Sequence, residues 1–325
     1  MKSFKLFTAF FLLMFATVFM AGCGDDAKNP VVVSDNQNQG NEEKPAGPAK
    51  YKIYLITMDS VDDFWKSIDK GCQQAVSEIG GIDYTWVGPD QNLDGPQMEC
   101  IDKAVADGTN AILLASSSPR GVIPSLEKAA AAGVKIVYVD NPSEFDSLAF
   151  LATDNEAAGK IAGETLKKHL EEVGITSGTI GMCANKDNVT STNLRNQGFR
   201  SVFEGSAYTL TDIFYMEDND QSLKDWTASH GDYVAFFGPN ERTARNIGEQ
   251  MRDMNNTKQI VMGFDTSDSV LTLINDGFIF ATMQQKPEVM GHDGIKIAVD
   301  ALEGKYTETN KRIDTGITVI YKDSI

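Results

Sequence analysis

The regular alternation of short β-rich runs with helical patterns, which continues from residue 51 to the end of the chain, limits the possible folds more than any other sequence feature. The runs form two groups of five: YKIYLITM, DYTWVG, AILLA, KIVYV and LAFLAT, then GTIGMC, LTDIFYM, VAFFG, QIVMGF and IFATM. Such alternation is typical of β-α-β units, because parallel strands need a crossover, usually a helix, between them. The pattern therefore predicts an α/β protein with two doubly wound, mostly parallel sheets.

Local signals for helix ends agree with this pattern. Asp154 is expected to cap a helix that continues to about Gly174, and Asn240 is expected to cap another. Glycine-containing turns such as Ala132-Gly133 and Asp276-Gly277 provide helix exits.

The N-terminal segment 1–22 predicts an export signal. Lys2 and Lys5 precede an apolar run, and small residues then lead to Cys23. Met-Ala-Gly-Cys resembles the lipobox of bacterial lipoproteins, in which this Cys becomes the acylated first residue. We expect Cys23 to carry a lipid that anchors the protein to the cell membrane outside the cytoplasm. An uncleaved anchor is the alternative, and it also places the chain outside the cytoplasm.

The rest of the chain divides into a tether and a folded part. Residues 23–50 are rich in Asn, Gln, Gly, Pro and acidic residues, which is typical of a flexible tether. Residues 51–325 exceed what one hydrophobic core usually organises, so two lobes are expected.

The formal net charge of −17 narrows the choice of partners. Phosphate polymers and acidic lipid surfaces would be repelled, so the sequence predicts no nucleic-acid partner and a membrane attachment that depends on the lipid. Three cysteines remain after Cys23, namely Cys72, Cys100 and Cys183. An odd number gives little support to a disulfide framework, and we expect all three to be small buried hydrophobic residues.

Polar residues gather where the predicted strands end, which is where ligands bind in open parallel sheets. They are Asp59 to Trp65, Ser116 to Ser118, Asp140-Asn141, Asn185 to Asn193, Asn240 and Asp265. Carboxylates and carboxamides suit a ligand with many hydroxyl groups, and aromatic rings pack against the apolar face of a sugar. Asp62, Phe64 and Trp65 would provide both kinds of contact.

A structural interpretation of the same loop stays open. Phe64 and Trp65 extend an apolar helical stripe and would then belong to the core. Asp59, Asp62 and Asp63 would then be helix-capping and first-turn acids.

Seven short stretches carry a family resemblance when their order and spacing are taken together. They are VDDFWKSIDKG (61–71), NAILL (110–114), GVKIVYVD (133–140), TDNEAAG (153–159), NLRNQGF (193–199), VMGFD (261–265) and ATMQQ (281–285). In this combination the chain resembles the ribose- and galactose-type periplasmic binding proteins, which are the solute receptors of bacterial ABC importers.

The resemblance implies lobes of residues 51–153 plus 286–314 and 154–285 plus 315–325, joined by a three-strand hinge with the ligand in the cleft between them. The ligand-binding positions that it implies are Asp62, Phe64, Trp65, Ser116, Asp140, Asn141, Asn193, Asn240, Asp265 and Gln285. The lobes are expected to close over the ligand.

Two departures from the family pattern bear on the ligand. The position of a second aromatic residue from the second lobe falls near Asn219, so a sugar ring would be stacked on one face only. Two arginines of the family correspond to Asn141 and Asn193, which predicts an electronegative pocket without those guanidinium groups. Such a pocket argues against a phosphorylated or carboxylated ligand and against ribose itself.

The resemblance implies a monomeric receptor that delivers a monosaccharide or polyol to an ABC permease. Alternative ligands are a nucleoside, an amino sugar or a furanosyl signalling molecule, and the alternative output is a chemoreceptor or sensor kinase. Lactose-repressor-type regulators share the fold, but an export signal and an acidic tether occupy the place of their basic DNA-binding headpiece. If aspartates bind neutral hydroxyls, affinity is expected to be almost flat from about pH 6 to 8, whereas a steep loss above about pH 7 would indicate a protonated amine.

The sequence predicts neither an enzyme nor a cofactor or metal site. His169, His230 and His292 lie away from the predicted strand ends and are expected at the surface. No G-x-S-x-G, P-loop or G-x-G-x-x-G motif is present. The Cys and His residues lack ligand spacing, and the run from Asp218 to Gln221 lacks the Gly and Glu of a calcium loop.

Overall fold

The computed structural model describes residues 49–187, 189–216 and 219–325, all of which belong to one compact unit of the chain. The predicted signal peptide, Cys23 and nearly all of the predicted tether lie outside these residues. In the described part of the chain, no helix is both long enough and apolar enough to cross a membrane.

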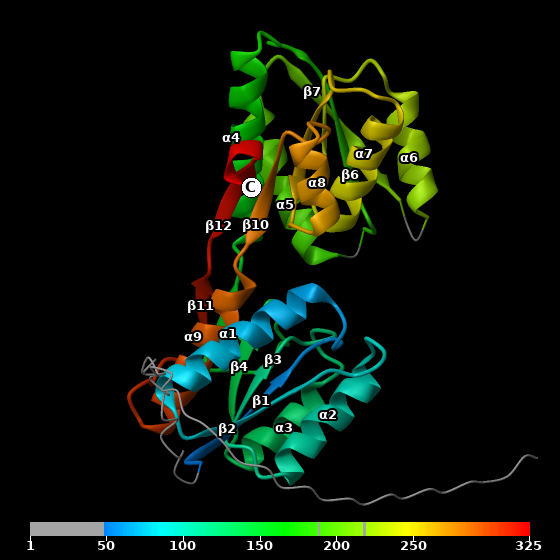
Figure 1. Ribbon diagram of the computed structural model, residues 1–325. Helices are drawn as coiled ribbons and strands as arrows, with labels where there is room; N and C mark the ends of the chain where they lie inside the picture. The colour runs from blue at the N-terminus through cyan, green and yellow to red at the C-terminus, as the bar shows by residue number, and fades with distance from the viewer. Residues whose placement is uncertain (1–48, 188, 217–218) are drawn as a thin grey trace, which may run out of the picture. The chain divides into compact units, whose positions relative to one another are not determined.

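The first sheet has the strand order β11-β5-β4-β3-β1-β2, and all its neighbouring strands are parallel (Figure 1). Its strands are β1 (Tyr51–Ile56), β2 (Ile82–Val87), β3 (Ala111–Leu114), β4 (Lys135–Val139), β5 (Ala149–Ala152) and β11 (Lys311–Asp314). One face packs against α1 (Asp63–Ile79) and α9 (Pro287–Leu302), and the other against α2 (Asp94–Ala106) and α3 (Ile123–Ala131). A separate hydrophobic core fills each face.

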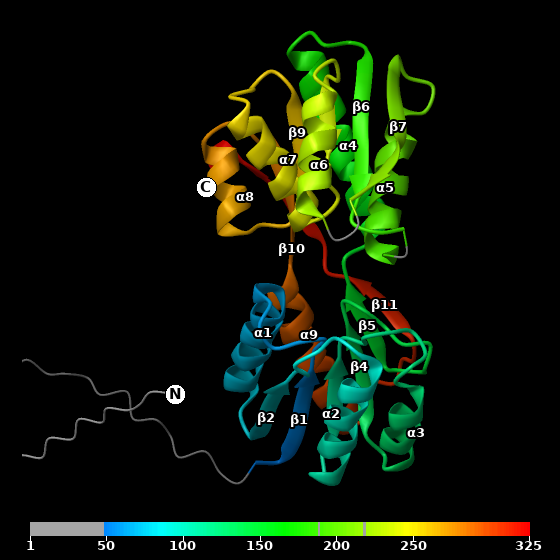
Figure 2. The same ribbon diagram turned by 90° about the vertical axis from the view of Figure 1, so that its right-hand side faces the viewer.

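The second sheet has the order β12-β10-β9-β8-β6-β7, and its one antiparallel pairing joins β10 and β12 (Figure 2). Its strands are β6 (Gly178–Ala184), β7 (Tyr208–Tyr215), β8 (Ala235–Phe237), β9 (Ile260–Phe264), β10 (Ala281–Gln285) and β12 (Ile317–Tyr321). One face packs against α4 (Asn155–Glu172) and α5 (Thr190–Phe203). The other packs against α6 (Asp220–Ser229), α7 (Glu241–Asp253) and α8 (Asp268–Asn275), and a short 3₁₀ helix, Lys322–Ser324, ends the chain.

The same close helix contact recurs in both halves of the molecule. A Cβ atom on Gly71 of α1 would lie 2.0 Å from the carbonyl oxygen of Glu288 in α9. A Cβ atom on Gly159 of α4 would lie 2.0 Å from the carbonyl oxygen of Arg195 in α5. Glycine is required at these positions because the helix backbones approach too closely for any side chain.

All ten predicted β-rich runs form strands, so the predicted α/β class is confirmed. The sequence analysis missed β11 and β12, which complete the two sheets as edge strands. The predicted helix caps are also confirmed, since Asp154 accepts a hydrogen bond from the N–H of Ala157 and Asn240 accepts one from the N–H of Thr243.

The cysteine prediction is confirmed for Cys72 and Cys183, which are fully buried free thiols. It is wrong for Cys100, which is only half-buried on α2 because it packs at the margin of the core between that helix and the sheet.

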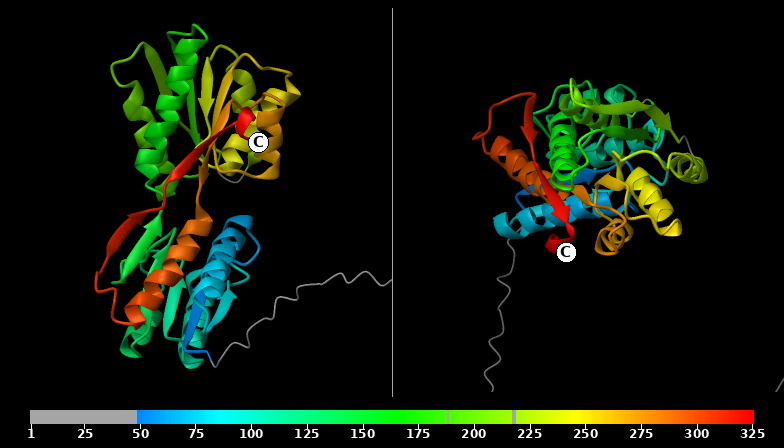
Figure 3. Two further views of the ribbon diagram at one scale, coloured as in Figure 1. Left: turned by 60° about the vertical axis from the view of Figure 1, so that its left-hand side comes forward. Right: turned by 90° about the horizontal axis from the view of Figure 1, so that it is seen from above.

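The chain passes between the two sheets three times, after β5, after β10 and between β11 and β12 (Figure 3). Hydrogen bonds tie the first and third of these crossing segments together. The N–H of Thr315 donates to the carbonyl oxygen of Ala152 at 3.0 Å, and the N–H of Asp154 donates to Oδ1 of Asp314 at 3.0 Å.

Candidate ligand-binding site

A cavity of about 870 Å³ lies where strands of both sheets end. The first sheet contributes the loop after β1, the first turn of α1 and the residue after β4. The second contributes the starts of α5 and α7 and the ends of β9 and β10. Among the described residues that line it, six carry carboxylates and two carry guanidinium groups: Asp62, Asp63, Asp140, Glu241, Asp265 and Glu288, with Arg195 and Arg242.

Most of the predicted ligand-binding residues line this cavity. They are Asp62, Phe64, Trp65, Asp140, Asn240, Asp265 and Gln285. Ser116, Asn141 and Asn193 are not among the lining residues, and each has a protein partner. Ser116 Oγ donates to the Ser118 carbonyl, Asn141 Nδ2 donates to Asp140 Oδ2, and Asn193 Nδ2 donates to the Asp187 carbonyl.

The loop before α1 is fixed by its own side chains. Asp62 caps α1 by accepting from the N–H of Phe64 at 2.9 Å. Asp59 Oδ1 accepts from the N–H groups of Val61 and Asp62, and its Oδ2 accepts from Nε1 of Trp65 at 3.2 Å. The predicted capping role and the predicted position on the cavity wall therefore apply together to Asp62.

The two aromatic residues of α1 both line the cavity and differ in burial. Trp65 is only 7% exposed and belongs to the core between α1 and the sheet, while Phe64 is half-buried. Their rings meet edge to face with centroids 5.2 Å apart. Among the described lining residues these two are the aromatic ones, and Asn219 instead caps α6 by accepting from the N–H of Gln221.

Asp140 and Asp265 occupy matching places, directly after β4 and β9. Both have a left-handed backbone, with φ of 61° and 67°. This conformation is uncommon for residues other than glycine, although Asp and Asn tolerate it best, and it concentrates at functional sites. It directs the chain away from each strand at the cavity wall.

The environment of Asp140 favours its protonated form. Burial raises the pKa of Asp140 to about 6, against the lowering effect of the Arg195 guanidinium and with smaller raising effects from Asp265 and Asp62. Asp140 Oδ2 accepts a hydrogen bond from Asn141 Nδ2 at 2.7 Å. The cavity therefore contains a carboxyl group that changes charge close to neutral pH.

Arg195 is the main lining residue that sequence analysis missed, and it brings a guanidinium group to the cavity wall from a position other than Asn141 and Asn193. It is 4% exposed, its Nε donates to Asn155 Oδ1 at 2.8 Å, and its Nη1 donates to the Pro239 carbonyl at 3.0 Å. Its Nη1 also lies 3.7 Å from Asp265 Oδ2, and its guanidinium carbon lies 3.7 Å from the centroid of the Phe264 ring. Burial lowers the pKa of Arg195, but an arginine keeps its charge in proteins.

A sequence signal for Arg195 exists in the spacing of α5. The buried positions of this helix include Thr192, Arg195, Asn196, Phe199 and Phe203, which repeat at three- and four-residue intervals. An arginine on the core-facing side of an amphipathic helix is expected to have a specific partner.

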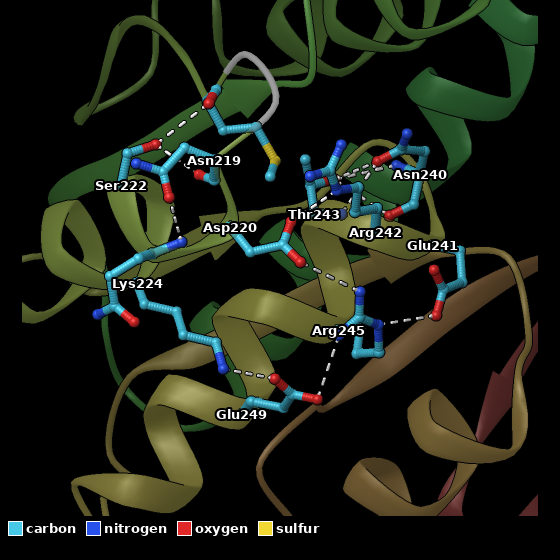
Figure 4. Close-up of polar contacts among 12 residues, drawn as sticks. Asn219, Asp220, Ser222, Lys224, Asn240, Glu241, Arg242, Thr243, Arg245 and Glu249 are labelled. Carbon is cyan, nitrogen blue, oxygen red and sulfur yellow. Dashed lines mark hydrogen bonds and ion pairs between the residues drawn. The ribbon is translucent and has the colours of Figure 1, made fainter. Parts of the chain in front are cut away.

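An ion-pair network holds the start of α7 at the cavity wall (Figure 4). Arg242 Nε donates to Asp220 Oδ1 at 2.6 Å. Arg245 lies 3.3 Å from carboxylate oxygens of both Glu241 and Glu249. The network joins α6 to α7 and orients Glu241 and Arg242, which line the cavity.

The described part of the cavity wall contains no histidine, because all three lie elsewhere. His169 stacks on Phe280, His230 packs near Tyr233, and His292 lies between Glu78 and Asp293. All three are partly exposed. Within the described ranges no cluster of three or more His, Cys, Asp or Glu residues is arranged to hold a metal ion.

Two sheets with flanking helices, three chain crossings and a polar cavity at the strand ends define a solute-binding protein with the type 1 periplasmic-binding fold. The model of the periplasmic binding protein domain family matches residues 53–306, and the chain belongs to this family.

Two relatives of this chain show that its sequence similarity to them is low. The D-ribose/D-allose-binding protein of Pseudomonas aeruginosa is 22% identical over 289 residues, which cover 81% of this chain and 86% of the relative. The ribose import binding protein of Bacillus subtilis is 24% identical over 275 residues, which cover 82% and 85%.

Solved structures of similar proteins contain sugars. One is an ABC transporter solute-binding protein of Agrobacterium vitis with bound D-fucose, which is 28% identical with a TM-score of 0.71 and covers 84% of this chain and 96% of that chain. A second protein from the same organism, with bound α-D-tagatopyranose, is 25% identical with a TM-score of 0.73, and the coverage is 84% and 95%.

Proposed function

We propose that this protein is an extracytoplasmic receptor that binds a monosaccharide or polyol and delivers it to an ABC importer. The observation that carries the proposal is the cavity in which carboxylates and amides from the strand ends of both sheets converge with two aromatic rings of α1. Ionised carboxylates accept hydrogen bonds from sugar hydroxyls, and aromatic rings pack against the apolar face of a pyranose or furanose. The sugars bound by its relatives support the same ligand class.

The residues proposed to contact the ligand are those that line the cavity: Asp62, Phe64, Trp65, Asp140, Arg195, Asn240, Asp265 and Gln285. In this proposal Asn141 acts through Asp140, to which it donates a hydrogen bond. Ser116 and Asn193 stay predictions, because their polar atoms bond to backbone carbonyls of their own loops.

The proposed working unit is a pair of lobes, residues 51–153 plus 286–314 and residues 154–285 plus 315–325, that close over the ligand. The membership of the two sheets supports these bounds. Ligand contacts from both lobes favour the closed state, which a permease distinguishes from the open one. A chemoreceptor or sensor kinase in place of the permease would require the same binding step.

The second candidate ligand is an amino sugar. Its support is the excess of carboxylates over guanidinium groups on the cavity wall, six against two in the described residues. A protonated amine would offset this charge, whereas phosphate or carboxylate groups would add to it. A nucleoside or a furanosyl signalling molecule remains a further alternative in the same cavity.

In the same proposal, the protein binds its ligand without catalysing a reaction and is a monomer. A lipid is attached at Cys23. The family supports the extracytoplasmic location. The lipid anchor is supported by the sequence 20–23, which lies outside the described residues.

A thermal-shift screen of residues 51–325, refolded to remove carried-over ligand, tests the function. The panel contains pentoses, hexoses, amino sugars, polyols and nucleosides. A ligand at about a thousand times its dissociation constant adds roughly 4 kcal/mol and raises the midpoint by several degrees. A shift with a sugar or polyol supports the proposal, whereas a shift with nucleosides alone contradicts the sugar assignment.

Substitution of Asp265 then tests the placement of the site. Asp265→Ala is expected to weaken binding by about 1 to 3 kcal/mol, because ligand hydroxyls lose their acceptor. Asp265→Asn separates this effect from backbone strain, since Asn tolerates the left-handed conformation. Asp253→Ala, at an exposed position at the end of α7, is the control. Equal affinities for all these variants would mean that the site is elsewhere.

A further inference from the structure

A chain of side-chain hydrogen bonds connects the crossing segments with the cavity. Thr153, which follows β5 on the first crossing segment, donates its hydroxyl to Gln285 Oε1 at 2.8 Å. Gln285 ends β10 at the second crossing and donates through Nε2 to Asp265 Oδ1 at 2.7 Å. Gln285 and Asp265 line the cavity, but Thr153 does not.

We propose that Thr153 is a positioning residue for ligand binding, which holds the Gln285 amide so that this amide orients the Asp265 carboxylate toward the ligand. This inference rests on the proposed function of the cavity. Thr153 acts through Gln285 and makes no ligand contact of its own.

The chemistry of the three groups allows a single arrangement of the amide. An ionised carboxylate only accepts hydrogen bonds, so Gln285 must turn Nε2 toward Asp265 and Oε1 away from it. Oε1 then needs a donor, because Gln285 is only 8% exposed. The hydroxyl of Thr153, which is 2% exposed, is that donor.

The position of Asp265 explains why the amide matters for binding. Its Oδ1 is held by Gln285, whereas Oδ2 accepts from the N–H of Glu241 at 3.3 Å and lies 3.7 Å from Arg195 Nη1. Contacts on both oxygens fix the carboxylate plane, and the remaining lone pairs are available to ligand hydroxyls. Loss of the Thr153 hydroxyl leaves Oε1 as a buried acceptor without a partner, which favours rotation of the amide and release of Asp265.

The chain provides a matched control at the third crossing segment. Thr315 is also a buried threonine, 8% exposed, but its hydroxyl has no hydrogen-bond partner among the described residues. Thr153→Val and Thr315→Val make the same chemical change at two crossing segments. The first change removes a bond to Gln285 and the second removes none.

The first measurement needs no ligand. In protein with ¹⁵N-labelled glutamine side chains, the Gln285 amide signal is identified by its absence in Gln285→Glu. Thr153→Val is expected to shift this signal and speed its hydrogen exchange, while Thr153→Ser, which keeps the hydroxyl, and Thr315→Val leave it unchanged. Thr153→Ala replaces Thr153→Val if valine prevents folding.

The second measurement is the dissociation constant for D-fucose, D-tagatose, D-ribose or D-arabinose, whichever stabilises the wild type. Thr153→Val is expected to weaken binding about 5-fold, as for loss of one hydrogen bond, and Thr153→Ser is expected to restore it. The proposal is overturned if Thr153→Val changes neither readout, or if Thr153→Ser or Thr315→Val behaves like it. If neither these four sugars nor any other sugar or polyol of the thermal-shift panel binds, the proposed sugar function fails, while the amide signal still decides whether Thr153 positions Gln285.

Discussion

At the scale of single residues, the cavity depends on two aspartates in an uncommon backbone conformation. Asp140 and Asp265 have positive φ angles at matching strand ends, which places a carboxylate from each sheet at the cavity wall. Arg195 lies near Asp265 and lowers the cost of ionising Asp140. Burial is nevertheless the dominant effect on Asp140 and raises its pKa to about 6.

Asp140 predicts a pH dependence of binding that replaces the flat profile expected from sequence. Its pKa of about 6 means that the carboxylate form, which accepts from hydroxyls, is lost as pH falls through about 6. Affinity for a neutral sugar, measured by calorimetry, is therefore expected to increase from pH 5 to 7 and to stay level above pH 7, and Asp140→Asn is expected to remove the increase. A steady loss of affinity above pH 7 would contradict a neutral ligand.

The raised pKa of Asp140 also predicts that Asp140→Asn stabilises the folded protein. The pKa of Asp140 is raised on folding, so ionisation destabilises the folded state, and this cost is complete above about pH 6 and decreases as pH falls from about 6 to about 4. The variant is expected to raise the free energy of unfolding by about 1 to 3 kcal/mol at pH 7.5, with a smaller difference at pH 5. Urea unfolding at both pH values measures it, and an equal difference at both would point to another cause.

At the scale of elements, each half of the molecule is built around a close pair of helices, α1 with α9 and α4 with α5. Helices α1 and α9 are distant in sequence, whereas α4 and α5 are consecutive helices. Glycines at the contacts allow the helix backbones to approach closely. This packing positions the helix starts that line the cavity.

Gly71→Ala is expected to lower the free energy of unfolding by about 1 to 3 kcal/mol, because the added methyl group overlaps the Glu288 carbonyl. Gly95→Ala on α2 is the control, since no atom lies within 4 Å of the added Cβ there. It is expected to raise the free energy of unfolding by up to about 1 kcal/mol through helix propensity. Urea unfolding compares the two, and similar values would contradict the close contact of α1 with α9.

The contact between α1 and α9 also contains a pH-sensitive pair. His292 Nε2 lies 2.9 Å from Glu78 Oε2, and hydrogen bonds to Glu78 and then Asp293 raise the pKa of His292. Because the folded pKa exceeds the unfolded value, its stabilising effect is complete below about pH 6.5 and is lost as pH increases through the folded pKa. The melting temperature of His292→Gln is expected to fall furthest below wild type near pH 5.5 and to approach it at pH 8.5. Ligand affinity is expected to be unchanged, and an effect on affinity would reopen the question of catalysis.

At the scale of the whole molecule, three crossing segments connect two sheets whose polar strand ends share one cavity. The chain thereby assembles each sheet from separate segments, and side chains such as Gln285 belong to a crossing segment and to the cavity at once. We expect opening and closing of the lobes to depend on these few segments.

The proposed lipid anchor at Cys23 is tested on the full-length protein. Cys23→Ser is expected to move the full-length protein from the membrane fraction to the soluble extracytoplasmic fraction, because acylation requires the thiol. Cys100→Ser, which changes a half-buried thiol on α2, is the control and should remain with the membrane. A Cys23→Ser protein that stays in the membrane fraction would instead support an uncleaved anchor.

Sequence alone determined the ten main strands, the helix caps at Asp154 and Asn240, and seven of the residues on the cavity wall. These features follow from local pattern, because strand periodicity, capping chemistry and the rule that ligands bind at strand ends act over short distances. The two edge strands gave a weaker signal, since β11 and β12 follow each other without a helix between them and so lie outside the regular alternation of strand and helix.

Tertiary structure alone decided how charges and amides are paired. Arg195 reaches Asp265 across 70 positions of sequence, and Thr153 reaches Gln285 across 132. Asn141 and Asn193 donate hydrogen bonds to Asp140 and to the Asp187 carbonyl, and these partners were not predicted from the sequence. The direction of a side chain and the pKa of a carboxyl group depend on neighbours from distant segments, and only the folded chain brings those neighbours together.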